Sequence, residues 1–292
     1  MRSPEFEAML APARLYPELW RLFLGLLTIL FSYAGGVAIL AVLLFAAVGP
    51  LEFFGWVRRV QSPTEPVPTL LLLATFYGMA LGPILAAGAC HFRGPGSLFG
   101  PRGETLRGFL TACVVALPLY LGLTAFGAYF DAPLPNLAWA DWLGWLPYAL
   151  PLILVQVSAE ELIFRGYLPQ QLAVRFRAPW IWFGLPAAIF AALHVNPAVP
   201  LQSNAVVIAS AFLFALIATD LTRRTGSLGA AIGLHFVNNA TGLLTISVSG
   251  TITGLSRWVT PDDIATVGLG AAALDLAFFV VLWRILVWVL DR

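Results

Sequence analysis

The sequence of 292 residues contains no lysine, only two cysteines and few charged residues of either sign. Charged side chains make up 11% of the chain, whereas a soluble domain carries roughly 25%. The net charge of +1 offers no basic surface, so nucleic acid is not an expected partner. Cys90 and Cys113 stand outside any metal-ligand spacing, and we interpret both as ordinary helix residues.

Hydrophobic residues fill most of the chain instead, at 60% of all positions. A chain this apolar could not cover a water-facing surface, so the lipid bilayer is its expected solvent. A membrane-spanning helix needs about 20 mostly apolar residues. Eight runs meet or approach this length: Leu22–Val48, Thr69–Ala89, Phe109–Phe130, Trp142–Leu162, Ile181–Val195, Ala205–Leu221, Leu228–Val248 and Val267–Val289. The sequence therefore predicts an all-α fold, a polytopic membrane helix bundle of about eight transmembrane helices.

The distribution of arginine predicts how these helices are oriented, because cytoplasmic segments are enriched in positive charge. With the N-terminus in the cytoplasm, the outer segments hold only Arg58, Arg59 and Arg257. The other thirteen arginines then fall in cytoplasmic segments: Arg2, Arg14, Arg21, Arg93, Arg102, Arg107, Arg165, Arg175, Arg177, Arg223, Arg224, Arg284 and Arg292. Both termini are predicted to be cytoplasmic. The lack of lysine fits a GC-rich genome, and we expect an integral protein of a bacterial inner membrane.

Two adjacent glutamates and an arginine end the fourth predicted span. Glu161 and Arg165 are four residues apart with the acid first, which favours an ion pair along a helix. Glu160 points about 100° away from Glu161 and has no such cation, so it is a candidate general base. The alternative is that both glutamates lie at a helix end among lipid headgroups.

Two further spans carry polar pairs at helical spacing. Phe190 and His194 share one face of the fifth span, which is short and predicted to be tilted or kinked at Pro186. His235 and Asn239 share one face of the seventh span and could donate two hydrogen bonds to one oxyanion. The alternatives are a packed histidine and polar contacts between helices. At 1.5 Å per residue these groups and Glu160 lie roughly 16 to 22 Å from the predicted cytoplasmic helix ends.

Other protease signatures are missing from the sequence. It contains no H-E-x-x-H motif, which argues against a zincin-type metalloprotease, and no G-x-S-G motif. Asp220 and Asp275 lack the contexts of paired catalytic aspartates, and Asp220 is predicted to pair with Arg224 four residues later.

Together the motifs Glu160-Glu161-x-x-x-Arg165, Phe190-x-x-x-His194 and His235-x-x-x-Asn239 resemble the CPBP family. This family comprises CAAX proteases and bacteriocin-processing enzymes and is related to the type II CaaX prenyl endopeptidase. The resemblance implies eight helices around a cytoplasm-accessible cavity. It implies that Glu160 activates a water with help from His194, that His235 and Asn239 stabilise the oxyanion, and that Glu161, Arg165 and Phe190 support the site.

The resemblance covers the middle of the chain and suggests three regions. We expect an N-terminal transmembrane region of three helices (1–141), a CPBP-like catalytic core of four helices (142–248) and a C-terminal transmembrane helix (249–292). The expected function is an intramembrane endopeptidase acting on a membrane-associated protein or peptide.

Two aspects of this function have alternatives. No cofactor is expected, because a glutamate base and two oxyanion donors supply the required roles; the alternative is zinc held by Glu160, His194 and His235. A non-catalytic scaffold or a bacteriocin-immunity-type protein of the same family would keep the same motifs. A small-molecule transporter is disfavoured, since the polar groups cluster in one region and no inverted halves are visible.

Overall fold

The computed structural model describes residues 3–197, 199–266 and 269–292, which form an all-α bundle. Its helices are α1 (Pro4–Leu10), α2 (Leu19–Gln61), α3 (Pro66–Ala74), α4 (Phe76–His91), α5 (Gly96–Phe99), α6 (Arg102–Phe130), α7 (Trp139–Glu161), α8 (Leu168–Arg175), α9 (Leu185–Ala192), α10 (Leu201–Thr225), α11 (Gly229–Leu244) and α12 (Leu269–Leu290). Shorter helical turns are η1 (Ala11–Arg14), η2 (Leu162–Tyr167), η3 (Trp180–Gly184) and η4 (Ile264–Thr266). The predicted fold class is confirmed.

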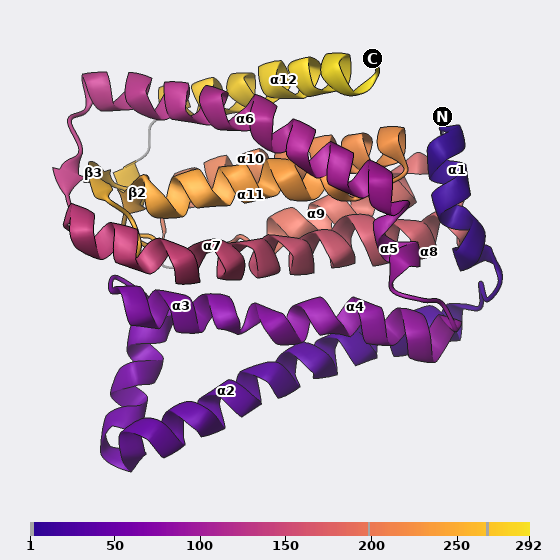
Figure 1. Ribbon diagram of the computed structural model, residues 1–292, viewed down its shortest axis with the longest axis horizontal. Helices are drawn as coiled ribbons and strands as arrows, with labels where there is room; N and C mark the ends of the chain where they lie inside the picture. Colours follow the sequence, from indigo (N-terminus) through magenta and orange to yellow (C-terminus); the bar gives the residue numbers. More distant parts are fainter. Residues whose placement is uncertain (1–2, 198, 267–268) are drawn as a thin grey trace.

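The long helices run side by side, and α11 lies between α6 and α7 in the middle of the bundle (Figure 1). Beyond α7 follow α4 and then α2, while α12 covers α6 and α10 on the opposite side. Both chain ends lie at the same end of the bundle (Figure 1). This order brings α7 and α11, which carry Glu160 and His235, into direct contact.

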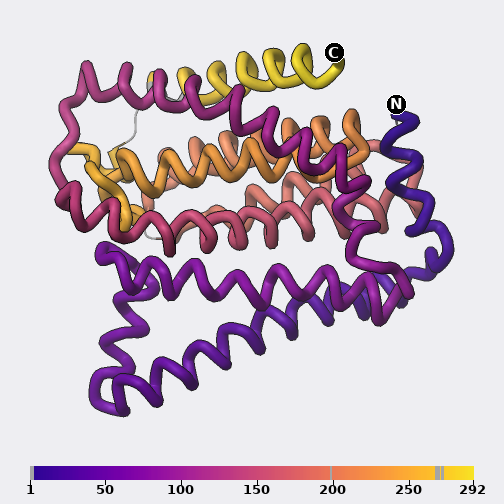
Figure 2. Tube along the Cα trace, in the orientation of Figure 1, coloured from indigo at the N-terminus to yellow at the C-terminus, as the bar shows by residue number. Residues whose placement is uncertain are grey.

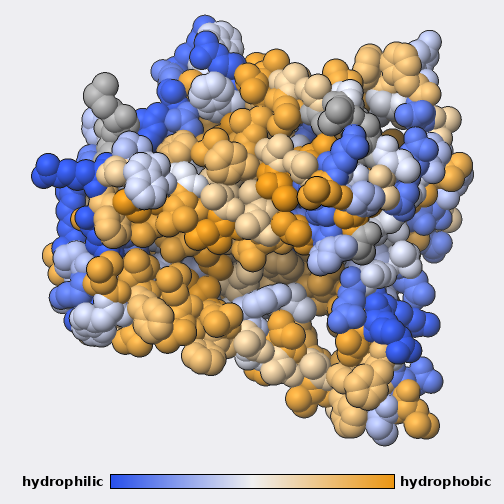
Figure 3. All heavy atoms as spheres, turned by 180° about the vertical axis from the view of Figure 1, so that it is seen from behind, coloured by the Kyte–Doolittle hydropathy of each residue, from blue (hydrophilic) through white to orange (hydrophobic). Residues whose placement is uncertain are grey.

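Six helical stretches among the described residues are long and apolar enough to cross a membrane. They are Leu19–Gln61, Pro66–His91, Arg102–Phe130, Trp139–Arg175, Leu201–Thr225 and Ala273–Leu290. Hydrophobic side chains cover the middle of the molecule, and hydrophilic ones gather toward its two ends (Figure 3). The chain is therefore an integral membrane protein.

The predicted count of about eight spans is not confirmed by these six. The fifth predicted span is a shorter apolar helix from Trp180 to Ala192, and its first turn, η3, is π-helical just before Pro186. The seventh predicted span is α11, which has 16 residues. Val267, where the eighth span was predicted to begin, and Arg2 lie outside the described residues.

Helix α2 continues far beyond its predicted end at Val48. Its backbone breaks at Gly49, whose φ of 77° favours glycine, and Pro50 then begins a second helical stretch. Figure 2 shows α2 diverging from α4 and then turning back toward α3. The predicted end of the span therefore coincides with a bend in the helix.

A small sheet at one end of the bundle was not predicted. Its strands are β1 (Leu134–Pro135), β2 (Ile246–Ser249) and β3 (Trp258–Asp263), in the order β1-β3-β2. Strand β3 pairs antiparallel with β1 and parallel with β2. Because β2 begins two residues after α11 ends, the prediction of helix up to Val248 is wrong.

The fourth predicted span does not end at the two glutamates. Helix α7 passes through the π-helical turn η2 into α8, and the stretch Trp139–Arg175 is continuous. Arg165 lies inside this stretch and is only 1% exposed, so counting it with the cytoplasmic loops was wrong. The alternative of two glutamates at a helix end is also wrong, since 14 residues of helix follow Glu161.

Close packing of α11 against α6 depends on two glycines four residues apart. A Cβ atom on Gly229 would lie 1.9 Å from the carbonyl oxygen of Thr105, and one on Gly233 would lie 2.5 Å from that of Phe109. Small residues at this spacing let two membrane helices approach closely. The approach brings Tyr120 of α6 beside Asn238 of α11.

The stretch Gly94–Gly103 is rich in proline and glycine, a composition that predicts a surface loop, but it is partly helical. It contains α5, and Leu98 in this turn is completely buried. The prediction of a plain surface loop is therefore wrong for this segment.

Candidate active site

The ion pair predicted between Glu161 and Arg165 is present. Arg165 Nη1 donates to Glu161 Oε1 over 2.8 Å, and the two side chains are 1% and 0% exposed. The guanidinium group also lies 4.4 Å from the ring centroid of Phe190 and 5.5 Å from that of Phe214. The aromatic faces and the carboxylate together stabilise a cation that has almost no access to water.

His235 lies between the two adjacent carboxylates. Its Nδ1 donates to Glu161 Oε1 over 2.7 Å, while its Nε2 is 3.7 Å from Glu160 Oε2. The side chain of His235 is 5% exposed and that of Glu160 is 12% exposed. The divergence of the two glutamates on α7 thus places one carboxylate at each ring nitrogen of a histidine on α11.

Glu160 has no arginine partner among the described residues, as the spacing predicted. Its Oε1 instead accepts a hydrogen bond from Gln156 Nε2, one turn earlier on α7. Gln156 Oε1 in turn accepts from Asn239 Nδ2 over 2.8 Å. Glu160 is therefore linked to Asn239 through a glutamine side chain.

The geometry of His235 and Asn239 differs from the simple pair of free donors that was predicted. His235 Nδ1 is engaged by Glu161, and one N–H of Asn239 is engaged by Gln156. The donors that remain are the second N–H of Asn239 and His235 Nε2, which donates when the ring is protonated. The neighbours on α7 therefore decide which atoms of the pair can face a substrate.

His194 lies just beyond the end of α9 and is exposed. Its Nδ1 donates to the carbonyl oxygen of Phe190 over 2.8 Å, so in the neutral ring Nε2 is the acceptor. The ring packs on Phe190 with centroids 4.6 Å apart, and Phe190 is 6.1 Å from His235. His194 is thus connected to the other candidate residues through one aromatic side chain.

Gln156 and Phe214 belong to the site but were missed in the sequence. Gln156 is four residues before Glu160 on the same helix face, and this spacing alone could have identified it. Phe214 of α10 packs on His235 with ring centroids 4.8 Å apart. Its phenylalanine type and its position in an apolar run offered no signal, because only the packing of α10 brings it to the site.

The alternative zinc ligands do not form a cluster in this structure. Among the described residues, no three His, Cys, Asp or Glu side chains lie together closely enough to hold a metal ion, and this includes Glu160, His194 and His235. The residues present do not fit a zinc site.

Other polar groups singled out in the sequence lie away from the site. Asp220 forms the predicted ion pair with Arg224 over 2.8 Å, and it also pairs with Arg223. Asp275 accepts a hydrogen bond from Ser210 over 2.6 Å.

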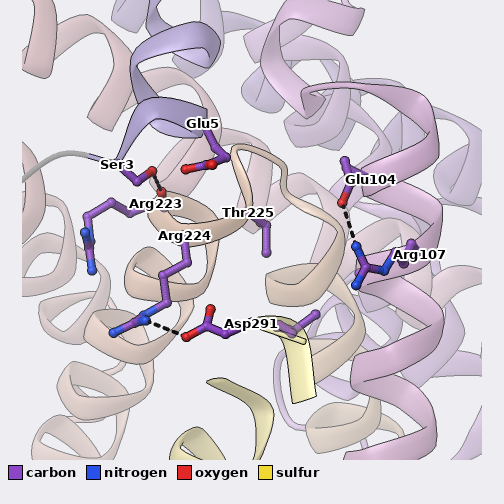
Figure 4. A pocket seen from close by; sticks show the side chains of 10 residues that line it. Ser3, Glu5, Glu104, Arg107, Arg223, Arg224, Thr225 and Asp291 are labelled. Atoms are coloured by element: carbon purple, nitrogen blue, oxygen red, sulfur yellow. Dashed lines mark hydrogen bonds and ion pairs between the residues drawn. The ribbon is translucent and has the colours of Figure 1, made fainter. Parts of the chain in front are cut away.

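A cavity of about 670 Å³ lies at the end of the bundle where α6, α10 and α12 meet the N-terminus (Figure 4). Around it, Arg224 pairs with Asp291 and Arg107 with Glu104 (Figure 4). It contains none of the candidate catalytic residues. It is therefore not the catalytic cavity that the family resemblance implied.

The segment that carries this site is similar to a known protein family. Residues 142–241 match the family described as type II CAAX prenyl endopeptidase Rce1-like. This segment is similar to that family, and we refer to it as the Rce1-like segment. The predicted resemblance to CAAX proteases is confirmed, and the Rce1-like segment contains Glu160, His194, His235 and Asn239.

The Rce1-like segment also has a relative among curated bacterial proteins. Over 100 residues the chain is 36% identical to the uncharacterized protein YyaK of Bacillus subtilis (strain 168). The alignment covers 34% of this chain and 32% of YyaK. No solved structure matches the chain.

Proposed function

We propose that this protein is an intramembrane endopeptidase, which hydrolyses a peptide bond of a membrane-associated protein or peptide. The observation that carries the proposal is the position of His235 between Glu161, at 2.7 Å, and Glu160, at 3.7 Å. The chain is an integral membrane protein, and its Rce1-like segment comes from a protease family. A carboxylate, a histidine and an amide at one place supply the groups that peptide hydrolysis requires.

In the proposed reaction Glu160 is the general base. Its carboxylate takes a proton from a water molecule, and the resulting hydroxide attacks the carbonyl carbon of the substrate peptide bond. His194 offers its Nε2 as an acceptor that assists in holding this water. When the tetrahedral intermediate collapses, Glu160 returns the proton to the leaving amine and the C–N bond breaks.

His235 and Asn239 stabilise the oxyanion of this intermediate. With His235 protonated, the charges of Glu160, Glu161, Arg165 and His235 sum to zero, so the buried cluster carries no uncompensated charge. The protonated ring donates from Nδ1 to Glu161 and presents Nε2–H on its other side. The second N–H of Asn239 is the other donor. Glu161 and Arg165 keep the histidine in place.

No metal ion takes part in the proposed mechanism. The acid–base role falls to Glu160 and the oxyanion is held by nitrogen donors, so every step is assigned to a residue of the chain. Activity should therefore persist in a chelator, and stoichiometric zinc in active protein, with activity that chelation removes and zinc restores, would contradict this.

The proposal can be tested with purified protein in lipid vesicles. The probes are a quenched fluorogenic peptide ending in a farnesylated CAAX sequence and a library of acyl-anchored peptides with the same reporter. Wild-type protein should cleave at least one probe, and Glu160→Gln should abolish cleavage while remaining folded and inserted. Glu104→Gln is the matched control, because Glu104 is exposed on α6 and pairs with Arg107.

Two outcomes would overturn the proposal. Cleavage that persists in Glu160→Gln would remove this residue from the chemistry. Failure of the wild-type protein to cleave either probe would favour a non-catalytic scaffold that retains the motifs.

A further inference from the structure

A chain of hydrogen bonds connects α6, outside the Rce1-like segment, to Glu160. The hydroxyl group of Tyr120 donates to Asn238 Oδ1 over 2.8 Å, and Asn238 Nδ2 donates to Asn239 Oδ1 over 2.9 Å. Asn239 Nδ2 donates to Gln156 Oε1 over 2.8 Å, and Gln156 Nε2 donates to Glu160 Oε1. Four side chains thus donate in sequence toward one carboxylate.

The direction of this chain follows from the acid at its end. An ionised carboxylate can only accept hydrogen bonds, so Gln156 must turn its NH₂ group toward Glu160. The amide oxygen of Gln156 then faces Asn239, which must donate to it. The oxygen of Asn239 then accepts from the NH₂ group of Asn238, and the oxygen of Asn238 accepts from the hydroxyl of Tyr120. Each amide therefore has one orientation that satisfies both of its neighbours.

The order of donors and acceptors fixes the orientation of the Asn239 amide. Its oxygen is occupied by Asn238 and one of its two N–H groups by Gln156, so the amide cannot rotate without breaking two hydrogen bonds. The other N–H group stays available in a defined direction. The same chain that holds the base also orients the amide that is proposed to contact the oxyanion.

Tyr120 and Gln156 are buried, whereas Asn238 and Asn239 between them are half-buried. Tyr120 is 8% exposed and Gln156 is 7% exposed. The ring of Tyr120 packs edge-on against that of Phe278 in α12, with centroids 4.8 Å apart. Water replaces a lost partner poorly at the two buried residues, so the hydrogen bonds of Tyr120 and Gln156 matter more than they would at a surface.

We propose that Gln156 and Tyr120 are positioning residues, which act through Asn238 and Asn239 to hold the Glu160 carboxylate and the Asn239 amide in their working orientations. Their roles rest on the proposed proteolysis. Gln156 contacts both groups directly, whereas Tyr120 anchors the far end of the chain from a helix outside the family segment. Breaking the chain should slow the chemical step and leave substrate binding almost unchanged.

The first test measures kcat and KM on the cleaved probe. Gln156→Leu removes a hydrogen bond to a charged group and should lower kcat about tenfold or more, with KM nearly constant. Tyr120→Phe removes only a hydroxyl group and should lower kcat about threefold. Tyr167→Phe is the matched control. The buried hydroxyl of Tyr167 bonds to His91 over 2.9 Å, and neither residue belongs to the series of hydrogen bonds that leads to Glu160. This control variant should leave kcat unchanged.

The double variant separates a connected chain from two independent structural effects. Once Gln156→Leu has broken the chain, Tyr120 is no longer linked to Glu160, so adding Tyr120→Phe should not lower kcat further. Losses that multiply in the double variant would overturn the proposal. So would a fall in thermal stability of Tyr120→Phe that accounts for all of its lost activity.

An infrared measurement tests the positioning role of Gln156 and Tyr120 independently of the proposed proteolysis. The antisymmetric carboxylate stretch of Glu160 is the band that Glu160→Gln removes from the difference spectrum. That band should shift in Gln156→Leu, by more than in Tyr120→Phe, and stay in place in Tyr167→Phe. An unshifted band in Gln156→Leu would refute the positioning role, whatever the activity. A shifted band in protein that cleaves no probe would instead count against proteolysis alone.

Discussion

At the scale of single residues, Glu161 is the acceptor on which the site depends. Its Oε1 receives hydrogen bonds from Arg165 on its own helix and from His235 on α11. Because Glu161 is completely buried, this oxygen has no water to replace either partner. The arginine therefore acts on His235 indirectly, by compensating the charge of the carboxylate that holds it.

We expect Arg165→Ala to destabilise the protein strongly. Removing one partner of a buried ion pair leaves the other charge uncompensated and typically costs about 3–5 kcal/mol. Thermal unfolding in detergent measures the change. The control is Arg107→Ala, whose pair with Glu104 is exposed and should contribute less than about 1 kcal/mol. Equal melting temperatures for the two variants would contradict a structural role for Arg165.

Asn239→Ala should act on turnover instead of on stability. The second N–H of Asn239 meets a neutral carbonyl in the bound substrate but an anion in the tetrahedral intermediate, and hydrogen bonds to charged groups are stronger. Losing one oxyanion donor should lower kcat by about 10²–10³ with KM nearly unchanged. An asparagine that only links helices would instead cost about 0.6 kcal/mol of stability and leave kcat intact. Comparing kcat with the melting temperature decides between them.

At the scale of elements, the contact between α6 and α11 sets the position of the amides. Gly233 brings the two backbones so close that a Cβ atom there would meet the Phe109 carbonyl oxygen at 2.5 Å. Tyr120 and Asn238 hydrogen-bond across the same pair of helices. Any substitution that separates the helices should therefore also disturb the hydrogen-bond chain.

Gly233→Val should destabilise the bundle, because overpacking a closely packed contact typically costs about 1–3 kcal/mol. Gly242→Val is the control on the same helix, since a Cβ at Gly242 meets no atom within 4 Å. Melting temperatures of the two variants in detergent give the comparison. If Gly242→Val proved as damaging as Gly233→Val, helix propensity and not the contact with α6 would explain the loss.

At the scale of the whole molecule, the orientation in the membrane stays a prediction based on arginine. Without Arg165, which is buried, the predicted cytoplasmic segments still hold twelve arginines against three outside. The two chain ends lie at the same end of the bundle (Figure 1). Reporter fusions after Gly94, Arg175 and Arg224 should therefore all report a cytoplasmic location. A periplasmic signal from any of the three would overturn the predicted topology.

Three segments of the protein differ from what hydrophobic length predicts: β2, the end of α7 and the end of α9. Hydrophobic length located the helices well, but it could not detect β2, because Ile246 and Val248 extend the apolar run of the helix that precedes them. Nor could it show that α7 continues beyond Glu161, since the charged residues there resemble a helix end until their burial is known. The exposed position of His194 follows from the end of α9 at Ala192, which the apolar pattern did not mark.

The sequence by itself determined the features that depend on local geometry. The apolar runs required a membrane, and the spacing of Glu161 and Arg165 produced their ion pair, because residues four apart on a helix are neighbours wherever the helix lies. Only the tertiary structure decided that His235 lies between the two carboxylates and that Gln156 joins Asn239 to Glu160. These contacts depend on how α7 and α11 are rotated against each other. That rotation is set by packing over the whole interface, which no local spacing records.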